Sequence, residues 1–396
     1  MKQAAIGLVA CFLAIAAAWP AEKSVTDFHT SGNRIVDAQN RPVRLCGINW
    51  YGFETKFFIP HGIWSRDYKY LLDAIKANGF NMIRLPFADE TIQSDPKSTK
   101  ISFESGNNAD LHDLTAMQIM DKIVAYANQL GLYIVLDNHR SEAGDSAESS
   151  GLWYNGVYPE STWLKDWETI ARRYRDVPAL IGMDLRNEPH NAHIGGSCWT
   201  GDETSLVPGC PESDVKHNWP MAATRAANEL LAINPKWLMF IEGVDEYSHD
   251  WYWNGGNLEG VRKYPVVLNV KNKVVYSPHE YGPRLYHQPW FNASTTAELL
   301  NEVRRKYWGY VNEEGIAPVW IGEFGTQNRP DRVASDIPGS QGQWFSNFIQ
   351  YLQDHPEVNW AYWALNGSDG DGLLDKDYSA TPPSMEKMAM LKKVQK

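Results

Sequence analysis

Short apolar runs alternate with longer amphipathic segments along most of the 396-residue chain. The apolar runs have the length and the β-branched content of buried strands, and the segments between them repeat with the 3.6-residue period of helices. The predicted strands are residues 44–49, 81–86, 132–138, 180–187, 237–242, 273–279, 317–323 and 359–365. The predicted helices are residues 68–75, 120–127, 161–175, 219–233, 295–314, 340–354 and 384–394, with a less regular pattern at 256–264.

Eight strands that alternate with helices predict an α/β fold, a (β/α)8 TIM barrel. Ahead of the barrel, residues 28–45 predict a short N-terminal β-hairpin, with Ile35-Val36 and Val43–Leu45 flanking a polar turn. A doubly wound open sheet is the alternative, but it usually carries a glycine-rich phosphate loop after its first strand, and the sequence has neither GxGxxG nor GxxxxGK[ST]. We find no internal repeat or linker, so residues 22–396 are expected to form a single domain.

The first 21 residues are predicted to be a secretory signal peptide rather than part of the fold. Lys2 precedes an apolar run from residue 4 to residue 18, and small and polar residues follow it. The run is shorter than the roughly 20 residues that a membrane-spanning helix needs, although a retained anchor is the alternative. We therefore expect a secreted, extracellular protein, with the periplasm as a further possibility and no membrane association after cleavage.

Export makes a disulfide bond possible. Cys198 and Cys210 lie in a stretch rich in glycine and proline and could close that loop, whereas Cys46 lies in an apolar run and is expected to be a buried free thiol. The sequence contains no CxxC or HExxH motif, and the first strand carries no HxH, so we expect no metal and no cofactor.

Composition narrows the range of partners. The formal net charge is −11, which argues against a nucleic-acid partner. Aromatic residues make up 12% of the chain, including 17 tryptophans. Besides filling the core, such residues suit a protein that stacks flat apolar rings on its ligand, and sugars present such faces.

Polar residues gather where the predicted strands end. In a barrel these ends meet on one face, and that face carries the active site. The residues at these positions are Arg84, Asp137, Asn138, His139, Asn187, Glu188, Glu242, His279, Glu280, Tyr281, Glu323 and Trp363.

Two glutamates stand out among these residues. Glu188 and Glu323 each follow an apolar strand and precede a proline or glycine that ends it. An ionisable side chain at such a place is costly unless it is paired or used. Taken alone, each glutamate could be structural, but a pair on one barrel mouth favours a catalytic role.

Several stretches in this order resemble glycoside hydrolase family 5, the bacterial cellulases that act as endo-β-1,4-glucanases. The matching stretches are GINWYGFET (47–55), IRLP (83–86), DNHR (137–140), RNEPH (186–190), YSPHEY (276–281), WIGEFG (320–325) and AYW (361–363). Together they span nearly the whole chain after the leader. The longer, cysteine-containing segment 191–218 departs from the family pattern, which leaves the finer substrate preference open.

The resemblance implies hydrolysis of internal β-1,4-glucosidic bonds of cellulose and related β-glucans by double displacement, with retained anomeric configuration. Retention requires the two carboxyl groups to lie about 5–5.5 Å apart. Glu323 would be the nucleophile and Glu188 the acid/base. Repulsion between two carboxylates at this distance would keep Glu188 protonated while Glu323 is charged.

The resemblance also implies supporting roles. Arg84 would hold Glu323 ionised and aligned, Tyr281 would donate a hydrogen bond to it, and Asn187 would bind the sugar 2-hydroxyl. His139 and His279 would line the subsite on the nonreducing side of the cut. Trp363 would stack under a sugar, and Trp50 and Trp253 are further stacking candidates. We expect a monomer whose partner is a β-glucan.

Three alternatives remain open from the sequence. The same mechanism could act on mannan or xyloglucan, or as an exo-acting β-glucosidase, because loop side chains set these preferences. A non-catalytic carbohydrate-binding barrel is disfavoured because both carboxylates are present. A metal-dependent hydrolase is disfavoured because residues 48–50 offer no HxH motif.

Overall fold

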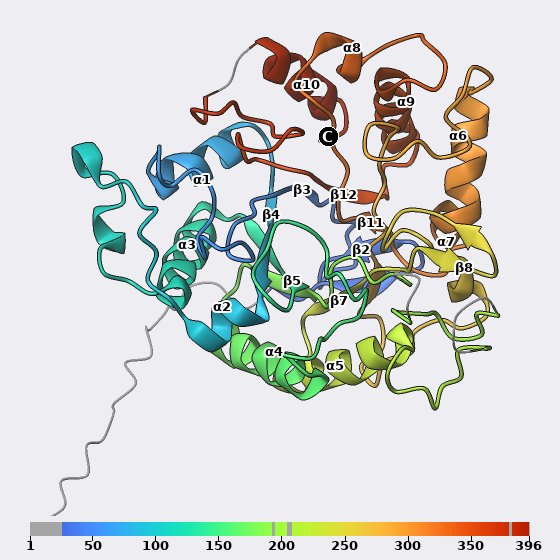
Figure 1. Ribbon diagram of the computed structural model, residues 1–396, viewed down its shortest axis with the longest axis horizontal. Coiled ribbons are helices and arrows are strands. Elements are labelled where there is room, and N and C mark those ends of the chain that lie inside the picture. Colours follow the sequence, from blue (N-terminus) through green and yellow to red (C-terminus); the bar gives the residue numbers. More distant parts are fainter. Residues whose placement is uncertain (1–25, 192–194, 204–207, 380–381, 396) are drawn as a thin grey trace, which may run out of the picture.

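The eight predicted strands form one sheet of parallel strands that curves into a barrel (Figure 1). The computed structural model describes residues 26–191, 195–203, 208–379 and 382–395, so the predicted signal peptide lies outside the described residues. The strands, in sheet order, are β10 (Val274–Tyr276), β7 (Leu238–Ile241), β6 (Leu180–Asp184), β5 (Tyr133–Arg140), β4 (Met82–Ala88), β3 (Cys46–Asn49), β12 (Asn359–Tyr362) and β11 (Trp320–Ile321).

The two edges of this sheet meet. Parallel bridges join Tyr276 to Val319 and His279 to Glu323, which closes the ring between β10 and β11. The predicted (β/α)8 barrel is therefore confirmed, and the open-sheet alternative is wrong. The register pairs Asn49 with Arg84 and Asp137 with Asp184, so polar residues of neighbouring strands reach the same level at the C-terminal mouth.

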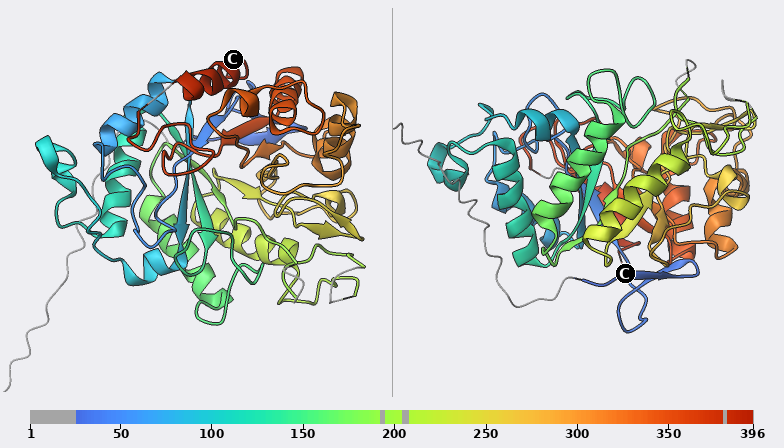
Figure 2. Two further views of the ribbon diagram at one scale, coloured as in Figure 1. Left: turned by 45° about the horizontal axis from the view of Figure 1, so that its top comes forward. Right: turned by 90° about the horizontal axis from the view of Figure 1, so that it is seen from below.

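Helices cover the outside of the barrel (Figures 1 and 2). They are α1 (Tyr68–Ala77), α3 (Ala116–Leu130), α4 (Glu160–Tyr174), α5 (Trp219–Ile233), α6 (Ala297–Arg304), α9 (Gln341–Asp354) and α10 (Pro382–Lys392). In α1 the predicted stripe Tyr68, Leu71, Leu72 and Ile75 is buried. Side-chain caps at Asp67, Thr115, Asn218, Thr296 and Ser340 fix where five of these helices begin.

Two predicted helices differ from the structure. The segment 256–264 forms only a short 3-10 helix, η3 (Glu259–Arg262), after a small hairpin of β8 (Glu246–Tyr247) and β9 (Asp250–Trp251). The predicted helix 295–314 is divided into α6, a π-helical turn η4 (Arg305–Gly309) and α7 (Tyr310–Glu313). Short helical turns that we did not predict are α2 (Asp89–Ser94), η1 (Glu104–Gly106), η2 (Ala109–Leu111) and α8 (Pro330–Val333).

The N-terminal hairpin is present, but its turn lies earlier than predicted. β1 (His29–Ser31) pairs with β2 (Arg34–Val36) around a two-residue turn at 32–33, where Gly32 has a φ of +56°. The predicted pairing of residues 35–36 with 43–45 is reduced to one bridge between Val36 and Pro42 and one hydrogen bond from Val43 to Ile35. The right panel of Figure 2 shows this hairpin, in blue, beneath the barrel.

The hairpin closes the N-terminal end of the barrel core. Phe28 and Ile35 belong to a buried apolar cluster with residues that come from the strands. Those strand residues are Met82, Val135, Ile181, Leu238, Phe240, Val275, Trp320 and Ala361. The barrel interior is thus solid below its polar mouth. Among the described residues, no helix has the length and apolar character needed to cross a membrane.

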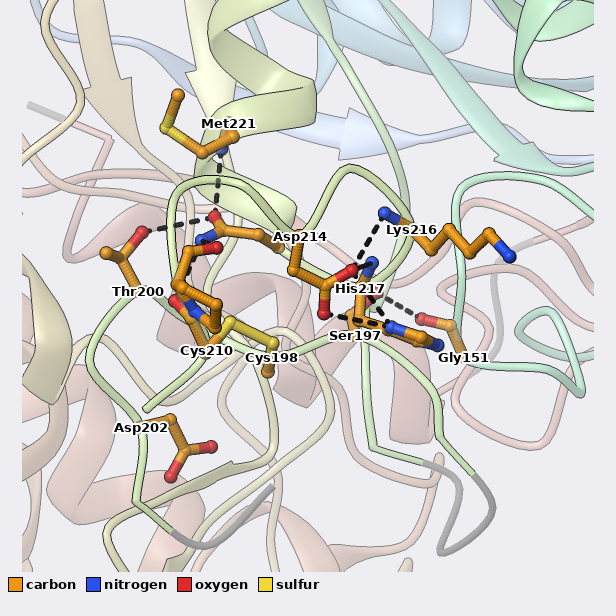
Figure 3. The surroundings of a disulfide bond; sticks show 12 residues. Gly151, Ser197, Cys198, Thr200, Asp202, Cys210, Asp214, Lys216, His217 and Met221 are labelled. Atoms are coloured by element: carbon orange, nitrogen blue, oxygen red, sulfur yellow. Dashed lines mark hydrogen bonds and ion pairs between the residues drawn. A yellow bond between two sulfur atoms is a disulfide. The ribbon is translucent and has the colours of Figure 1, made fainter. Parts of the chain in front are cut away.

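The predicted disulfide between Cys198 and Cys210 is present, and Cys46 is a buried free thiol as expected. Figure 3 shows how the surrounding loop is held. Ser197 Oγ donates a hydrogen bond to the carbonyl of Gly151 (2.6 Å), and Asn218, the N-cap of α5, donates to the carbonyl of Cys210 (3.0 Å). The disulfide therefore closes a loop in the long segment after β6, and the hydrogen bond from Asn218 ties that loop to the start of α5.

Removing this bond should lower stability without abolishing the fold. Closing a loop of this size contributes about 3 kcal/mol through the entropy of the unfolded chain. We expect a Cys198→Ser, Cys210→Ser double variant to unfold a few degrees below the wild type in a calorimetric scan. Treatment with reductant should lower the Tm of the wild type by the same amount and leave the Tm of the variant unchanged. If the variant and the wild type with its disulfide intact had the same Tm, this account would be contradicted.

Candidate active site

Arg84 occupies the centre of the barrel mouth. It lies in β4, its side chain is fully buried, and each of its five N–H groups has an oxygen acceptor. The acceptors are Asp184 (2.9 Å), Asn49 (3.1 Å), Glu323 (2.7 Å), Asn187 (3.0 Å) and Glu242 (3.2 Å), and Asp137 lies within 3.2 Å. Burial alone would lower the pKa of Arg84, but the surrounding carboxylates raise it well above its ordinary value.

Glu323 is fixed at both carboxylate oxygens. Oε1 accepts a hydrogen bond from Nη1 of Arg84 (2.7 Å), and Oε2 accepts one from the hydroxyl of Tyr281 (2.7 Å). Both contacts were predicted from the sequence. The carboxylate is 4% exposed, so it reaches the cleft with little freedom to rotate. A preorganised anion of this kind suits attack on an electrophilic carbon.

Glu188 is held by its backbone as well as by its side chain. It follows β6 with a φ of +49°, a left-handed conformation that is unfavourable for a residue other than glycine. Its backbone N–H donates to Oε2 of Glu242 (2.7 Å). Its Oε1 lies 3.0 Å from Nδ1 of His279. The side chain is more exposed than that of Glu323, at 18% against 5%.

The two glutamates face one another across His279. One oxygen of Glu188, one ring nitrogen of His279 and one oxygen of Glu323 all lie within 4.8 Å of one another. Carboxyl groups this close match the short separation of a retaining pair rather than the 6.5–9.5 Å of an inverting pair, which must leave room for water.

The protonation of this group differs from our expectation. Burial alone would raise the pKa of Glu188, but the hydrogen bond and charge of His279 hold it below its ordinary value. Burial would lower the pKa of His279, but Glu242, Glu323 and Glu188 raise it well above its ordinary value. Repulsion between the two glutamates alone predicts a protonated Glu188, but the cation between them reverses that direction.

His279 also differs in position. Its side chain has no exposed area, so the prediction that it lines a sugar subsite is wrong. His139 is 6% exposed and donates from Nδ1 to Asp137 (2.7 Å). Burial lowers the pKa of His139 to about 3, so its ring is neutral and Nε2 is an acceptor.

Asn187 and Trp363 lie beside the pair. Asn187 accepts from Arg84 through Oδ1 (3.0 Å), so its NH2 group is the donor end of the side chain. Trp363 is partly exposed, and its indole stacks on Tyr51 (ring centroids 5.1 Å apart, planes at 6°) and on His139 (5.6 Å, 16°). Its orientation is thus set by these two neighbouring rings.

The two other tryptophans predicted to stack on sugar, Trp50 and Trp253, differ in their position in the structure. Trp50 has no exposed area, and its indole N–H donates to the carbonyl of His61 (2.9 Å), so it is a core residue and its assignment as a sugar platform is wrong. Trp253 is 5% exposed and packs edge-on against Tyr281, with ring centroids 6.2 Å apart. Its role in binding stays a prediction.

A cavity of about 360 Å³ adjoins Trp363 and His139. Its lining residues are Tyr51, Glu54, Thr55, His61, His139, Asp145, Trp363, Ser368, Asp369 and Gly370. These side chains combine an aromatic wall with hydroxyl, imidazole and carboxyl groups. That mixture is what a ring with an apolar face and a hydroxylated edge requires.

Two buried carboxylates of the site received no role in the sequence analysis. Asp184 ion-pairs with Arg84 (2.9 Å), and Glu242 contacts Arg84, His279 and the backbone of Glu188. Glu242 ends the predicted strand 237–242, which was the available signal, whereas Asp184 lies inside the predicted strand 180–187. Contacts between strands that are far apart in the sequence could not be read from it.

Comparison with known proteins agrees with this geometry. Residues 36–369 match the family model for cellulase (glycosyl hydrolase family 5). The chain is 40% identical to an endoglucanase of Paenibacillus polymyxa, over 89% of this chain and 83% of the relative. It is 33% identical to the major extracellular endoglucanase of Xanthomonas campestris pv. campestris, over 91% and 70% of the two chains.

Solved structures of endoglucanases share the fold of this chain. The chain resembles an endocellulase from Pyrococcus horikoshii that was crystallised in complex with cellotetraose, with a TM-score of 0.81 and 30% identity over 94% of this chain and 99% of the other. It also resembles the catalytic domain of the Xanthomonas enzyme, with a TM-score of 0.79 and 31% identity over 93% and 99%. The chain therefore belongs to glycosyl hydrolase family 5, the cellulase family, and is a glycoside hydrolase.

Proposed function

We propose that the protein is a secreted endo-β-1,4-glucanase that hydrolyses cellulose and related β-glucans with retention of configuration. The observation that carries this proposal is the close pair of Glu188 and Glu323, within 4.8 Å of each other and of His279 at the barrel mouth. Glu323 acts as the nucleophile, because both its oxygens are oriented by strong donors. Glu188 acts as the acid/base.

In the first step, a carboxylate oxygen of Glu323 attacks the anomeric carbon and the glycosidic bond breaks. Glu188 protonates the departing oxygen, and the proton it needs is one hydrogen bond away on Nδ1 of His279 (3.0 Å). Asn187 binds the 2-hydroxyl, where contacts strengthen in the transition state. The products are a glycosyl ester of Glu323 and a shortened glucan.

In the second step, Glu188 removes a proton from water, and the water oxygen attacks the anomeric carbon of the ester. The charge on Glu323 is absent while the ester exists, so the environment of Glu188 changes between the steps. Glu323 attacks from the face opposite to the departing oxygen, and water then attacks from the face opposite to Glu323, so the two inversions restore the original configuration. The released carboxylate returns to Arg84 and Tyr281.

The substrate class is inferred from the cleft and from the relatives. The stacked indole of Trp363 borders a cavity of about 360 Å³, which suits the flat face of a glucose unit. Relatives that are 40% and 33% identical are named endoglucanases, and a similar solved structure holds cellotetraose. One relative is named extracellular, which supports secretion. We further propose that the protein works as a monomer.

Internal cleavage should be visible in soluble carboxymethylcellulose. We expect viscosity to fall steeply while few new reducing ends appear, because one internal cut halves a chain. Reducing ends without loss of viscosity would mean exo action. If neither changes, β-1,4-glucan is the wrong polymer, and hydrolysis of mannan or xyloglucan under the same conditions would identify the substrate.

The two glutamates should be separable by their dependence on the leaving group. Glu188→Gln should lower kcat/KM on cellotetraose by on the order of 10³-fold and affect dinitrophenyl cellobioside far less, because a good leaving group needs no proton. Glu323→Gln should abolish turnover of both substrates, since the nucleophile is lost. Equal losses on both substrates in Glu188→Gln would contradict its role as the acid.

Arg84→Lys should show that the five-donor geometry matters beyond the charge. An ammonium has three donors on one atom and cannot reach all the acceptors, so buried carboxylates lose partners at a cost of about 3–5 kcal/mol. We expect a lower midpoint in denaturant unfolding and at least a 100-fold loss of kcat. Arg172→Lys, at an exposed pair with Glu168 (2.7 Å), is the control and should change neither quantity.

A further inference from the structure

Glu242 is a fully buried carboxyl that the proposed mechanism does not use. It directly follows β7, and its two oxygens have separate contacts. Oε2 accepts the backbone N–H of Glu188 (2.7 Å). Oε1 lies 3.2 Å from Nε2 of His279 and 3.2 Å from Nη2 of Arg84. Glu242 thus touches the acid/base at one oxygen and the partner of the acid/base at the other.

The hydrogen bond from the backbone N–H of Glu188 to Glu242 helps to hold a strained backbone conformation at Glu188. Glu188 adopts a φ of +49°, and this conformation persists only where surrounding contacts over-determine it. Glu242 supplies one such contact through the N–H of Glu188. Gly255 packs closely against both Glu242 and Glu188. A Cβ on Gly255 would lie 2.1 Å from Oε2 of Glu242 and 3.2 Å from Cα of Glu188. Any larger residue there would displace the carboxyl.

The contact between Glu242 and His279 places three proton-binding groups, Glu242, His279 and Glu188, next to one another. His279 lies between Glu242 at Nε2 (3.2 Å) and Glu188 at Nδ1 (3.0 Å). Burial raises the pKa of Glu242 well above its ordinary value, against the opposing charges of His279 and Arg84, and the pKa of His279 is raised as well. The contact between Glu242 and His279 is an ion pair without hydrogen-bond geometry, so the charge on each group shifts the proton affinity of the other and the two titrate as a pair.

From these contacts we propose that Glu242 is a positioning residue for the acid/base: it fixes the peptide of Glu188 and stabilises the protonated ring of His279, which supplies the proton to Glu188. This inference rests on the proposed function of Glu188.

The proton movements balance over the two steps. In the first, Nδ1–H of His279 gives its proton to Oε1 of Glu188, Glu188 protonates the departing oxygen, and His279 becomes neutral. In the second, Glu188 takes a proton from water and returns it to Nδ1. Glu242 stays in place throughout and stabilises the charged form of the ring at the beginning and the end of the cycle.

Other ionisable groups face these three groups from every neighbouring strand, and they set the background against which the three titrate. They are Arg84 on β4, Asp137 and His139 on β5, Asp184 on β6, His190 beyond Glu188, Tyr281 beyond β10 and Glu323 beyond β11. Among them, Asp184 provides a matched control. It is a buried carboxyl that contacts Arg84 (2.9 Å), as Glu242 does, but it makes no hydrogen bond or ion pair with Glu188 or His279 in the described part of the chain.

The test compares Glu242→Gln with Asp184→Asn in the full chain, on cellotetraose and on dinitrophenyl cellobioside. We expect Glu242→Gln to lower kcat/KM on cellotetraose by about 100-fold and on the activated substrate by less than about threefold, because only the first needs the acid. Asp184→Asn should change both substrates by the same factor, since it acts through Arg84.

The pH profile gives a second readout. Losing the Glu242 carboxyl should move the alkaline limb of kcat/KM on cellotetraose to lower pH by about one unit, because a negative charge no longer helps to retain the shared proton. Asp184→Asn should not separate the two substrates at any pH. A structural defect alone would lower the amplitude of the profile without moving its limb.

The outcomes are distinguishable. Equal losses on both substrates in Glu242→Gln, no loss on either, or the same separation in Asp184→Asn would overturn the inference. If the wild type hydrolyses neither substrate, the proposed function fails instead. If thermal unfolding shows that Glu242→Gln is not folded, the Gly255→Ala variant is tested in its place. This substitution displaces the Glu242 carboxyl without removing it. It should produce the same difference in kcat/KM between the two substrates.

Discussion

The burial of one guanidinium among several carboxylates determines the organisation of this active site. Arg84 lies buried at the barrel mouth, and its five N–H groups reach acceptors on or just after four other strands. A buried charge is tolerated only when it is fully paired, so the positions of Asp184, Glu242 and Glu323 depend on it. The barrel makes this possible because parallel strands bring their C-terminal ends to one level.

A second cation extends the same arrangement to Glu188. His279 lies between Glu188, Glu242 and Glu323, at 3.0, 3.2 and 3.7 Å. Two cations and a set of carboxylates thus share few protons in a space that excludes solvent. In such a site the protonation of one glutamate depends on its neighbours as much as on the opposite glutamate. Reactivity is therefore a property of the cluster, and residues that never touch the sugar contribute to it.

Much of this could be predicted from the sequence. The strands were found because fully buried parallel strands are continuous apolar runs, and the polar residues after them marked the mouth. Glu188, Glu323, Arg84 and Tyr281 were placed by motif, and the contacts among them agree. The features that were missed depend on tertiary contacts. Trp50 and Trp363 look alike in the sequence, but only the structure shows that one is core and the other faces the cleft. The hairpin turn at Gly32, the helix broken at residues 305–309 and the low pKa of Glu188 likewise depend on neighbours distant in the chain.

The central claim is that Glu323 and Glu188 act in two successive displacements at one carbon, and the anomeric form of the first product tests it most directly. Proton NMR can follow the reducing-end anomers during the first minutes of cellotetraose hydrolysis, before mutarotation equilibrates them. A separation of at most 4.8 Å between carboxylate oxygens predicts that the newly formed end appears first as the β-anomer. Initial appearance of the α-anomer would mean a single displacement by water, and the roles assigned to the two glutamates would be wrong.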